Sequence, residues 1–131
     1  MTISQLGMTV LLDVESDQLD SIANAARNLD ARMQKLSATR QAPGGVHFVA
    51  FGVIPANETG ADSRLLIELN IDEPANQTIE NLWNSCPAEI SDVLACCKLQ
   101  SVPASGHEFA RLIADKDVGA GTYFVALPGL G

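Results

Sequence analysis

The side chains that could bind a ligand fall on two stretches that read as strands, residues 8–15 and 64–72. In the second stretch Glu68 and Asn70 alternate with leucine and isoleucine, so both polar groups share the side opposite the apolar one. Thr9 holds a similar polar position in the first stretch. These groups can line a small-molecule cavity, or they can hydrogen-bond across a dimer interface and fix its register. The sequence leaves both interpretations open.

Two further residues are candidates for the same cavity. His47 begins a strand at 46–54, and it is a structural histidine unless it faces the cavity as a general base or axial haem ligand. Tyr123 lies in a short apolar stretch near the end of the sequence. The candidate ligand-binding set is therefore Glu68, Asn70, Thr9, His47 and Tyr123. No residue is assigned a catalytic role.

The cysteines and the second histidine do not form a metal-binding pattern. Cys86, Cys96, Cys97 and His107 contain no C-x-x-C pair, and their spacing fits no standard zinc site. His107 lies inside a capping box, Ser105 to Glu108, where an exposed histidine is expected. We therefore predict no metal and no cofactor, with haem as the alternative. An odd number of cysteines, two of them adjacent, favours a reduced, cytoplasmic setting.

Length and composition indicate one globular domain over residues 1–131, complete in itself or the N-terminal part of a longer protein. Hydrophobic residues make up 47%, which is typical of a chain with a packed core. Sixteen acidic residues against eight basic ones give a net charge of −8 and no basic stripe, which disfavours nucleic-acid binding. No apolar run approaches the ~20 residues of a membrane span. We expect neither a nucleic-acid nor a membrane partner.

The order of elements predicts an α+β fold. Strands are expected at 8–15, 46–54, 64–72 and 122–127, with a helix after the first strand and a helical region before the last. The apolar stripe of the first helix is Leu19, Ile22, Ala26, Leu29, Met33 and Leu36, after a cap at Ser16 or Asp17. This order is the ferredoxin-like βαββαβ arrangement, an antiparallel four-stranded sheet covered by helices on one face.

Helices on one face would leave the other face open. The open face would expose Leu11 and Leu66 together with Phe48 or Phe51 and Tyr123 or Phe124. A monomer rarely leaves such a patch in water, and an apolar edge strand at 46–54 adds to the problem. We therefore expect a homodimer through the open sheet face, or a neighbouring domain that covers it.

Three segments carry a family resemblance: GVHFVAFGVI, RLLIELNID and TYFVALPG. They resemble HFARF, LLFESNYDG and YYVGTPG of an uncharacterised bacterial module in the dimeric α+β barrel superfamily. The matching positions are His47, Phe48, Phe51, Leu65, Leu66, Glu68, Asn70, Asp72, Tyr123, Val125, Pro128 and Gly129. Ala50 stands where the module has an arginine, and Glu73 stands where it has a glycine. If that arginine pairs with the position of Glu68, this chain lacks the partner.

The resemblance implies a dimeric barrel and admits several activities. The superfamily includes monooxygenases, muconolactone-isomerase-like enzymes and haem proteins of the chlorite-dismutase-like and dye-decolourising-peroxidase-like kinds. The module itself occurs in longer proteins, some near peroxidase- or catalase-like regions. We predict a non-enzymatic dimerisation or small-molecule-binding domain. The alternatives are a monooxygenase-like or haem-dependent peroxidase-like barrel enzyme, and an accessory domain docked on its neighbour.

Overall fold

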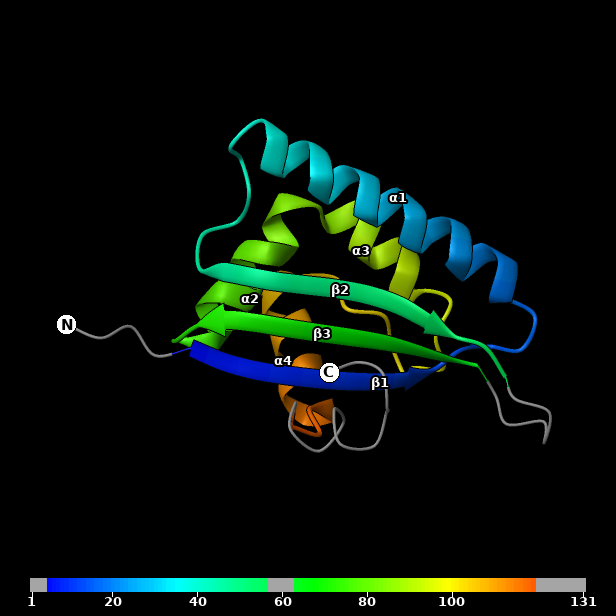
Figure 1. Cartoon of the computed structure of the whole chain (residues 1–131). Coiled ribbons are helices and arrows are strands. Elements are labelled where there is room, and N and C mark those ends of the chain that lie inside the picture. Colours follow the sequence, from blue (N-terminus) through cyan, green and yellow to red (C-terminus); the bar gives the residue numbers. More distant parts are fainter. Residues whose placement is uncertain (1–4, 57–62, 120–131) are drawn as a thin grey trace, which may run out of the picture.

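The computed structural model describes residues 5–56 and 63–119. This part of the chain is an α+β fold with three strands and four helices (Figure 1). The elements are β1 (Gln5–Asp13), α1 (Leu19–Ala38), β2 (Val46–Ile54), β3 (Arg64–Asp72), α2 (Ala75–Ser85), α3 (Pro87–Leu94) and α4 (Gly106–Lys116). The bounds of β2 and β3 confirm the strands predicted at 46–54 and 64–72.

The sheet is antiparallel and has the order β1-β3-β2, so β3 is central. Along β3 the odd-numbered residues from Leu65 to Ile71 are buried and the even-numbered ones are partly exposed. The helices lie on the buried side, with α1 along β2 and α4 behind β1 (Figure 1). One face of the sheet therefore packs on helices, and the other face carries Glu68 and Asn70.

The four-stranded sheet predicted from the sequence is wrong for the described chain, where the sheet has three strands. The strand expected at 122–127 lies outside the described residues. The outer edge of β1 forms hydrogen bonds with the turn that follows α4. Val118 N–H donates to the Thr9 carbonyl at 2.8 Å, and Asp117 Oδ1 accepts from Thr9 N–H at 3.0 Å. In the described chain this side of β1 therefore has two isolated bridges, Val10 to Asp117 and, just past the end of β1, Val14 to Cys97, and no strand ladder.

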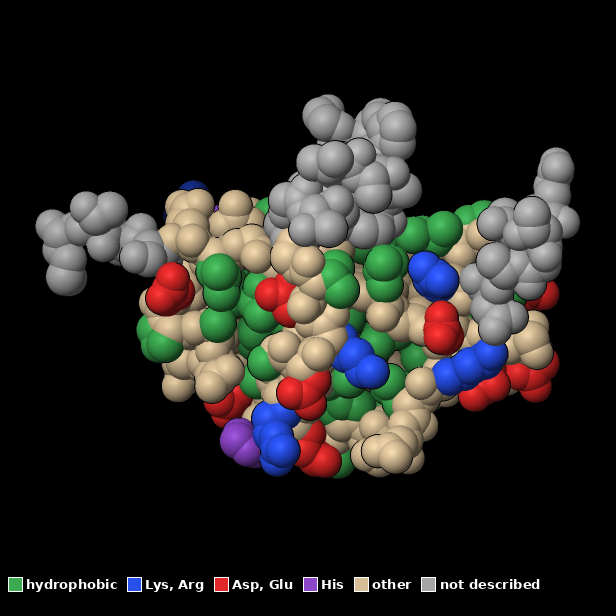
Figure 2. All heavy atoms as spheres, turned by 90° about the horizontal axis from the view of Figure 1, so that it is seen from below, with side chains coloured by type: hydrophobic (Ala, Val, Ile, Leu, Met, Phe, Trp, Pro, Cys, Tyr) green, Lys and Arg blue, Asp and Glu red, His purple; other side chains and the backbone are tan. Residues whose placement is uncertain are grey.

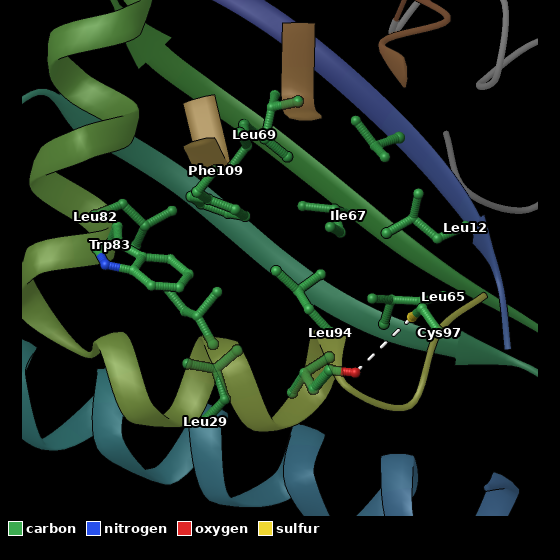
Figure 3. Packing of buried hydrophobic residues seen from close by; sticks show 14 of the residues in the cluster. Leu12, Leu29, Leu65, Ile67, Leu69, Leu82, Trp83, Leu94, Cys97 and Phe109 are labelled. Atoms are coloured by element: carbon green, nitrogen blue, oxygen red, sulfur yellow. Dashed lines mark hydrogen bonds between the residues drawn. The ribbon is translucent and has the colours of Figure 1, made fainter. Parts of the chain in front are cut away.

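The core fills the space between β1, β3 and the helices. Trp83 of α2 and Phe109 of α4 pack with ring centroids 5.5 Å apart. Figure 3 shows this pair beside Leu69 and Leu82, at one end of a continuous layer of buried side chains. The largest fully buried residues are Phe109, Ile22, Leu29, Leu65, Ile67, Ile71, Ile79, Leu82, Ile90, Leu94, Ile113 and Val10.

Local signals for the helices are confirmed in part. Ser105 caps α4 by accepting from Glu108 N–H at 3.2 Å, as the capping box predicts. α1 begins later than predicted, at Leu19, and no side chain caps it. Its buried stripe contains Ala25 in place of Ala26, and Leu19 is 39% exposed. The predicted stripe was therefore correct over its central turns and wrong at its start.

Candidate functional site

Three of the predicted site residues meet on the sheet face away from the helices, which we call the open face. Thr9 of β1 lies directly opposite Glu68 of β3. Asn70 follows Glu68 on the same side of β3, and its partner on β1 is Gly7. Directly opposed side chains in an antiparallel pair have Cβ atoms about 5 Å apart. The hydroxyl, the carboxylate and the amide therefore form one cluster across two strands.

Two oxygens of this cluster are buried without a hydrogen-bond partner in the described part of the chain. They are Thr9 Oγ1 and Asn70 Oδ1. Thr9 is completely inaccessible, whereas Asn70 and Glu68 are half-buried and reach the surface. A buried polar atom without a partner costs about 1–3 kcal/mol. These two oxygens are thus the part of the open face that has most to gain from an added hydrogen-bond donor.

The residues around the cluster are small. Ala50 of β2 lies opposite Glu68 on its second side, and Gly52 lies opposite Leu66. A Cβ added at Gly52 would meet nothing within 4 Å. Gly7 lies opposite Asn70 on β1, so the positions that flank the polar cluster on both neighbouring strands carry small side chains. Periodicity could not identify this set, because it depends on the cross-strand register.

Apolar side chains border the polar cluster at both ends. Phe48 is 55% exposed, and Leu11, Leu66 and Ile54 are half-buried. Strand parity places all four on the open face. The face is thus mixed, with a polar centre and an apolar border. The sequence predicted its apolar members Leu11 and Leu66 correctly, and it left the choice between Phe48 and Phe51 open. Phe51 lies on the helix side, packed against the core.

His47 lies away from this centre. The register of β2 on β3 shifts between Val46 and Phe48, so His47 has no directly opposed residue on β3. Its Nε2 is 2.6 Å from Asp72 Oδ1. Asp72 is the described partner of that nitrogen, so Nε2 would have to leave Asp72 before it could bind a haem iron. Tyr123 lies outside the described residues. The structure thus brings together Thr9, Glu68 and Asn70 and separates His47 from them.

Two hollows lie outside the open face. The larger, about 580 Å³, lies between α4 and the segment before it, and it is lined by both Lys and Arg side chains and by Glu108 and Asp115. The smaller, about 130 Å³, lies between the end of α1 and the start of β2. Figure 2 shows the molecule from below, where acidic, basic and hydrophobic side chains are interspersed. Neither hollow concentrates one kind of charge.

The cysteines are free and buried, which gives no sign of a redox centre. Burial raises the pKa of all three thiols, and that of Cys97 reaches about 12. Cys97 Sγ donates to the Val93 carbonyl at 3.8 Å, the contact drawn as a dashed line in Figure 3. Within residues 5–56 and 63–119, no group of three His, Cys, Asp or Glu side chains could hold a metal ion.

Comparisons with protein-family models, with curated proteins and with solved structures found no match to this chain. The resemblance to the dimeric α+β barrel superfamily therefore stays a prediction. None of the helices in the described ranges is long and apolar enough to cross a membrane.

Proposed function

We propose that this domain binds a small organic molecule on the open face, without catalysing a reaction. The observation that carries the proposal is the pair of buried oxygens without partners, Thr9 Oγ1 and Asn70 Oδ1, beside the half-buried Glu68. A ligand that bonds to them would remove a desolvation cost that the free protein bears. Proteins place few polar groups in ligand sites, and these groups fix the orientation of the ligand.

The chemistry of the cluster favours a ligand that donates hydrogen bonds. The carboxylate of Glu68 and Oδ1 of Asn70 are acceptors, and Thr9 Oγ1 can accept as well. The chain carries a net charge of −8, which disfavours an anionic ligand. We therefore propose an amine, amide or alcohol whose apolar part lies on Leu66 and Phe48.

A homodimer through the open face is the second candidate, because a second copy could also satisfy these oxygens. The half-exposed Phe48 and the half-buried Leu66 favour it. Ligand uptake is preferred because a face-to-face dimer with its twofold axis at the centre of the face would bring the two Glu68 carboxylates together. The described cation of β3, Arg64, lies at the far end of the strand and pairs with Asp13. Burying like charges in this way is costly.

A thermal-shift screen tests the proposal. A library of small amines, amides and alcohols, with carboxylic acids and haem as comparison classes, is added to the wild type and to Thr9→Val. A ligand held only by the folded state at 100 times its Kd adds about 2.7 kcal/mol to stability. The proposal expects donors to raise the melting temperature of the wild type and to have a weaker effect on Thr9→Val.

Two results would oppose it. If only carboxylic acids or haem stabilise the protein, the chemistry assigned to the cluster is wrong. If stabilising compounds act equally on the wild type and on Thr9→Val, they bind elsewhere. Ala114→Val, on the exposed side of α4, is the control for a valine introduced away from the open face, and it is expected to respond to the compounds as the wild type does.

A further inference from the structure

The two edges of the sheet are treated differently by the rest of the chain. The outer edge of β1 is bonded at Thr9 by Asp117 and Val118. Past the end of β1, Glu15 N–H donates to the Cys96 carbonyl, and Lys98 N–H donates to the Asp13 carbonyl. These contacts occupy the middle and the end of this edge.

The outer edge of β2 makes no such hydrogen bonds in the described ranges, although α1 packs along this strand. Within residues 5–56 and 63–119, the backbone hydrogen bonds of β2 all go to β3. Each of its nine residues is at least partly exposed, whereas alternate residues of β3 are fully enclosed. An exposed strand edge is a template for pairing with another chain unless charges, prolines or bulges blunt it. β2 has one register shift near its start, and it is regular from Phe48 to Ile54.

The composition of β2 suits a partner with the same charge as this chain. The strand reads VHFVAFGVI and contains no Asp, Glu, Lys or Arg, although the whole chain has a net charge of −8. A second copy could therefore approach along this strand without placing like charges in contact. A basic partner would find no acidic side chain on the strand to recognise.

The side chains of β2 also complement one another. In an antiparallel pair of β2 strands with the twofold axis at Ala50, Phe48 of each copy lies opposite Gly52 of the other. Phe48 is 55% exposed, and a Cβ added at Gly52 would have no neighbouring heavy atom within 4 Å. An aromatic ring beside an edge glycine covers the backbone that the glycine leaves bare. The same register places the two small Ala50 side chains next to each other on the axis.

We propose that two copies of this chain pair along their β2 strands, antiparallel and centred on Ala50, to form one continuous six-stranded sheet. The pairing uses the edge of the sheet and leaves the open face of each copy free, so it does not rest on ligand binding there. It differs from the face-to-face homodimer, in which the sheets stack.

Light scattering coupled to gel filtration of the wild type and two variants tests the assembly. The wild type is expected to have twice the mass of one chain at micromolar concentration. Phe48→Lys puts a charge at the pairing edge and is expected to raise the dimer dissociation constant at least about tenfold, a change of 1.4 kcal/mol. Ala114→Lys introduces the same charge on the exposed side of α4 and is expected to leave the mass unchanged. Circular dichroism confirms that each variant is folded.

A disulfide tests the register independently of Phe48. Directly opposed residues in an antiparallel pair have Cα atoms about 4.5–5.5 Å apart, within the range of a disulfide. With oxidised glutathione, Ala50→Cys is expected to form a covalent dimer, and the wild type, whose cysteines are all buried, is not. A monomeric wild type would overturn the proposal, as would a Phe48→Lys dimer of undiminished affinity. Cross-linking of Leu66→Cys but not of Ala50→Cys would show face-to-face packing instead.

Discussion

His47 Nε2 lies 2.6 Å from Asp72 Oδ1 and joins the first residues of β2 to the last residue of β3. The contact sits where β2 departs from regular pairing, between Val46 and Phe48. The histidine that the sequence offered as a candidate ligand-binding residue thus has a structural partner in the fold.

The first prediction concerns this pair. His47→Ala is expected to lower the free energy of unfolding by less than about 1 kcal/mol at pH 7, because a hydrogen bond between two partly exposed side chains contributes little. Urea titration measures the change. Asp72→Asn and the double variant His47→Ala/Asp72→Asn complete a double-mutant cycle. The double variant is expected to lose at most a few tenths of a kcal/mol more free energy of unfolding than the more destabilised of the two single variants. A loss of several kcal/mol would mean that the pair is buried in solution.

Gly45 and Gly44 form a matched pair for the second prediction. Gly45 has φ = +84°, and a Cβ there would lie 3.1 Å from the side chain of Thr78. A Cβ at Gly44 would meet nothing within 4 Å. Gly45→Ala is therefore expected to destabilise the fold by at least about 1 kcal/mol, and Gly44→Ala to stay within about 0.5 kcal/mol of the wild type. Equal effects of the two substitutions in urea titration would contradict the described turn.

The third prediction concerns the pH dependence of stability above neutrality. Burial raises the pKa of Cys97 to about 12 from an ordinary value of 9.0. Between these values the unfolded thiol loses its proton and the folded one keeps it, so stability falls as the pH rises. For one titrating group, the free energy of unfolding can fall by at most about 1.4 kcal/mol per pH unit. Below pH 9 the thiol is protonated in both states and has no effect.

Urea titrations at pH 8, 9 and 10 of the wild type and of Cys97→Ala measure this contribution. The variant loses packing at every pH, but its stability is expected to fall less steeply between pH 9 and 10. Parallel curves for the two proteins would show that Cys97 is not buried as described. The slower reaction of native thiols with Ellman's reagent, compared with the unfolded chain, is an independent check.

Local patterns predicted much of the fold. The apolar run VHFVAFGVI and the alternation in RLLIELNID predicted the bounds of β2 and β3 to the residue. The spacing of Ile22, Leu29 and Leu36 marked the buried side of α1, and Ser105 marked the start of α4. These signals are short-range, because each depends on neighbours within one element.

The sheet order and the site needed long-range information. Nothing in the local pattern of Asp117 and Val118 indicates that they bond to the edge of β1. Alternation places Glu68 and Asn70 on one side of a strand, but only the register places Gly7, Thr9 and Ala50 around them. The sequence therefore predicted the polar residues of the open face and missed the small residues that flank them.

Thr9 and Thr78 give the most direct test of the claim that the open face holds unsatisfied polar atoms. Both residues are buried, at 0% and 5% exposure. Thr78 Oγ1 donates to the Asp72 carbonyl at 2.9 Å, whereas Thr9 Oγ1 has no hydrogen-bond partner among the described residues. Valine matches threonine in shape and removes the hydroxyl in both cases.

The decisive measurement is the free energy of unfolding of Thr9→Val and Thr78→Val without added ligand. Thr78→Val is expected to lose about 1–2 kcal/mol, because it leaves the Asp72 carbonyl without this donor. Thr9→Val is expected to equal the wild type or to exceed it by up to about 1 kcal/mol, because no bond is lost and a desolvation cost is removed. A loss of more than about 1 kcal/mol in Thr9→Val would contradict the account, since it would show that the hydroxyl is already satisfied in the free protein.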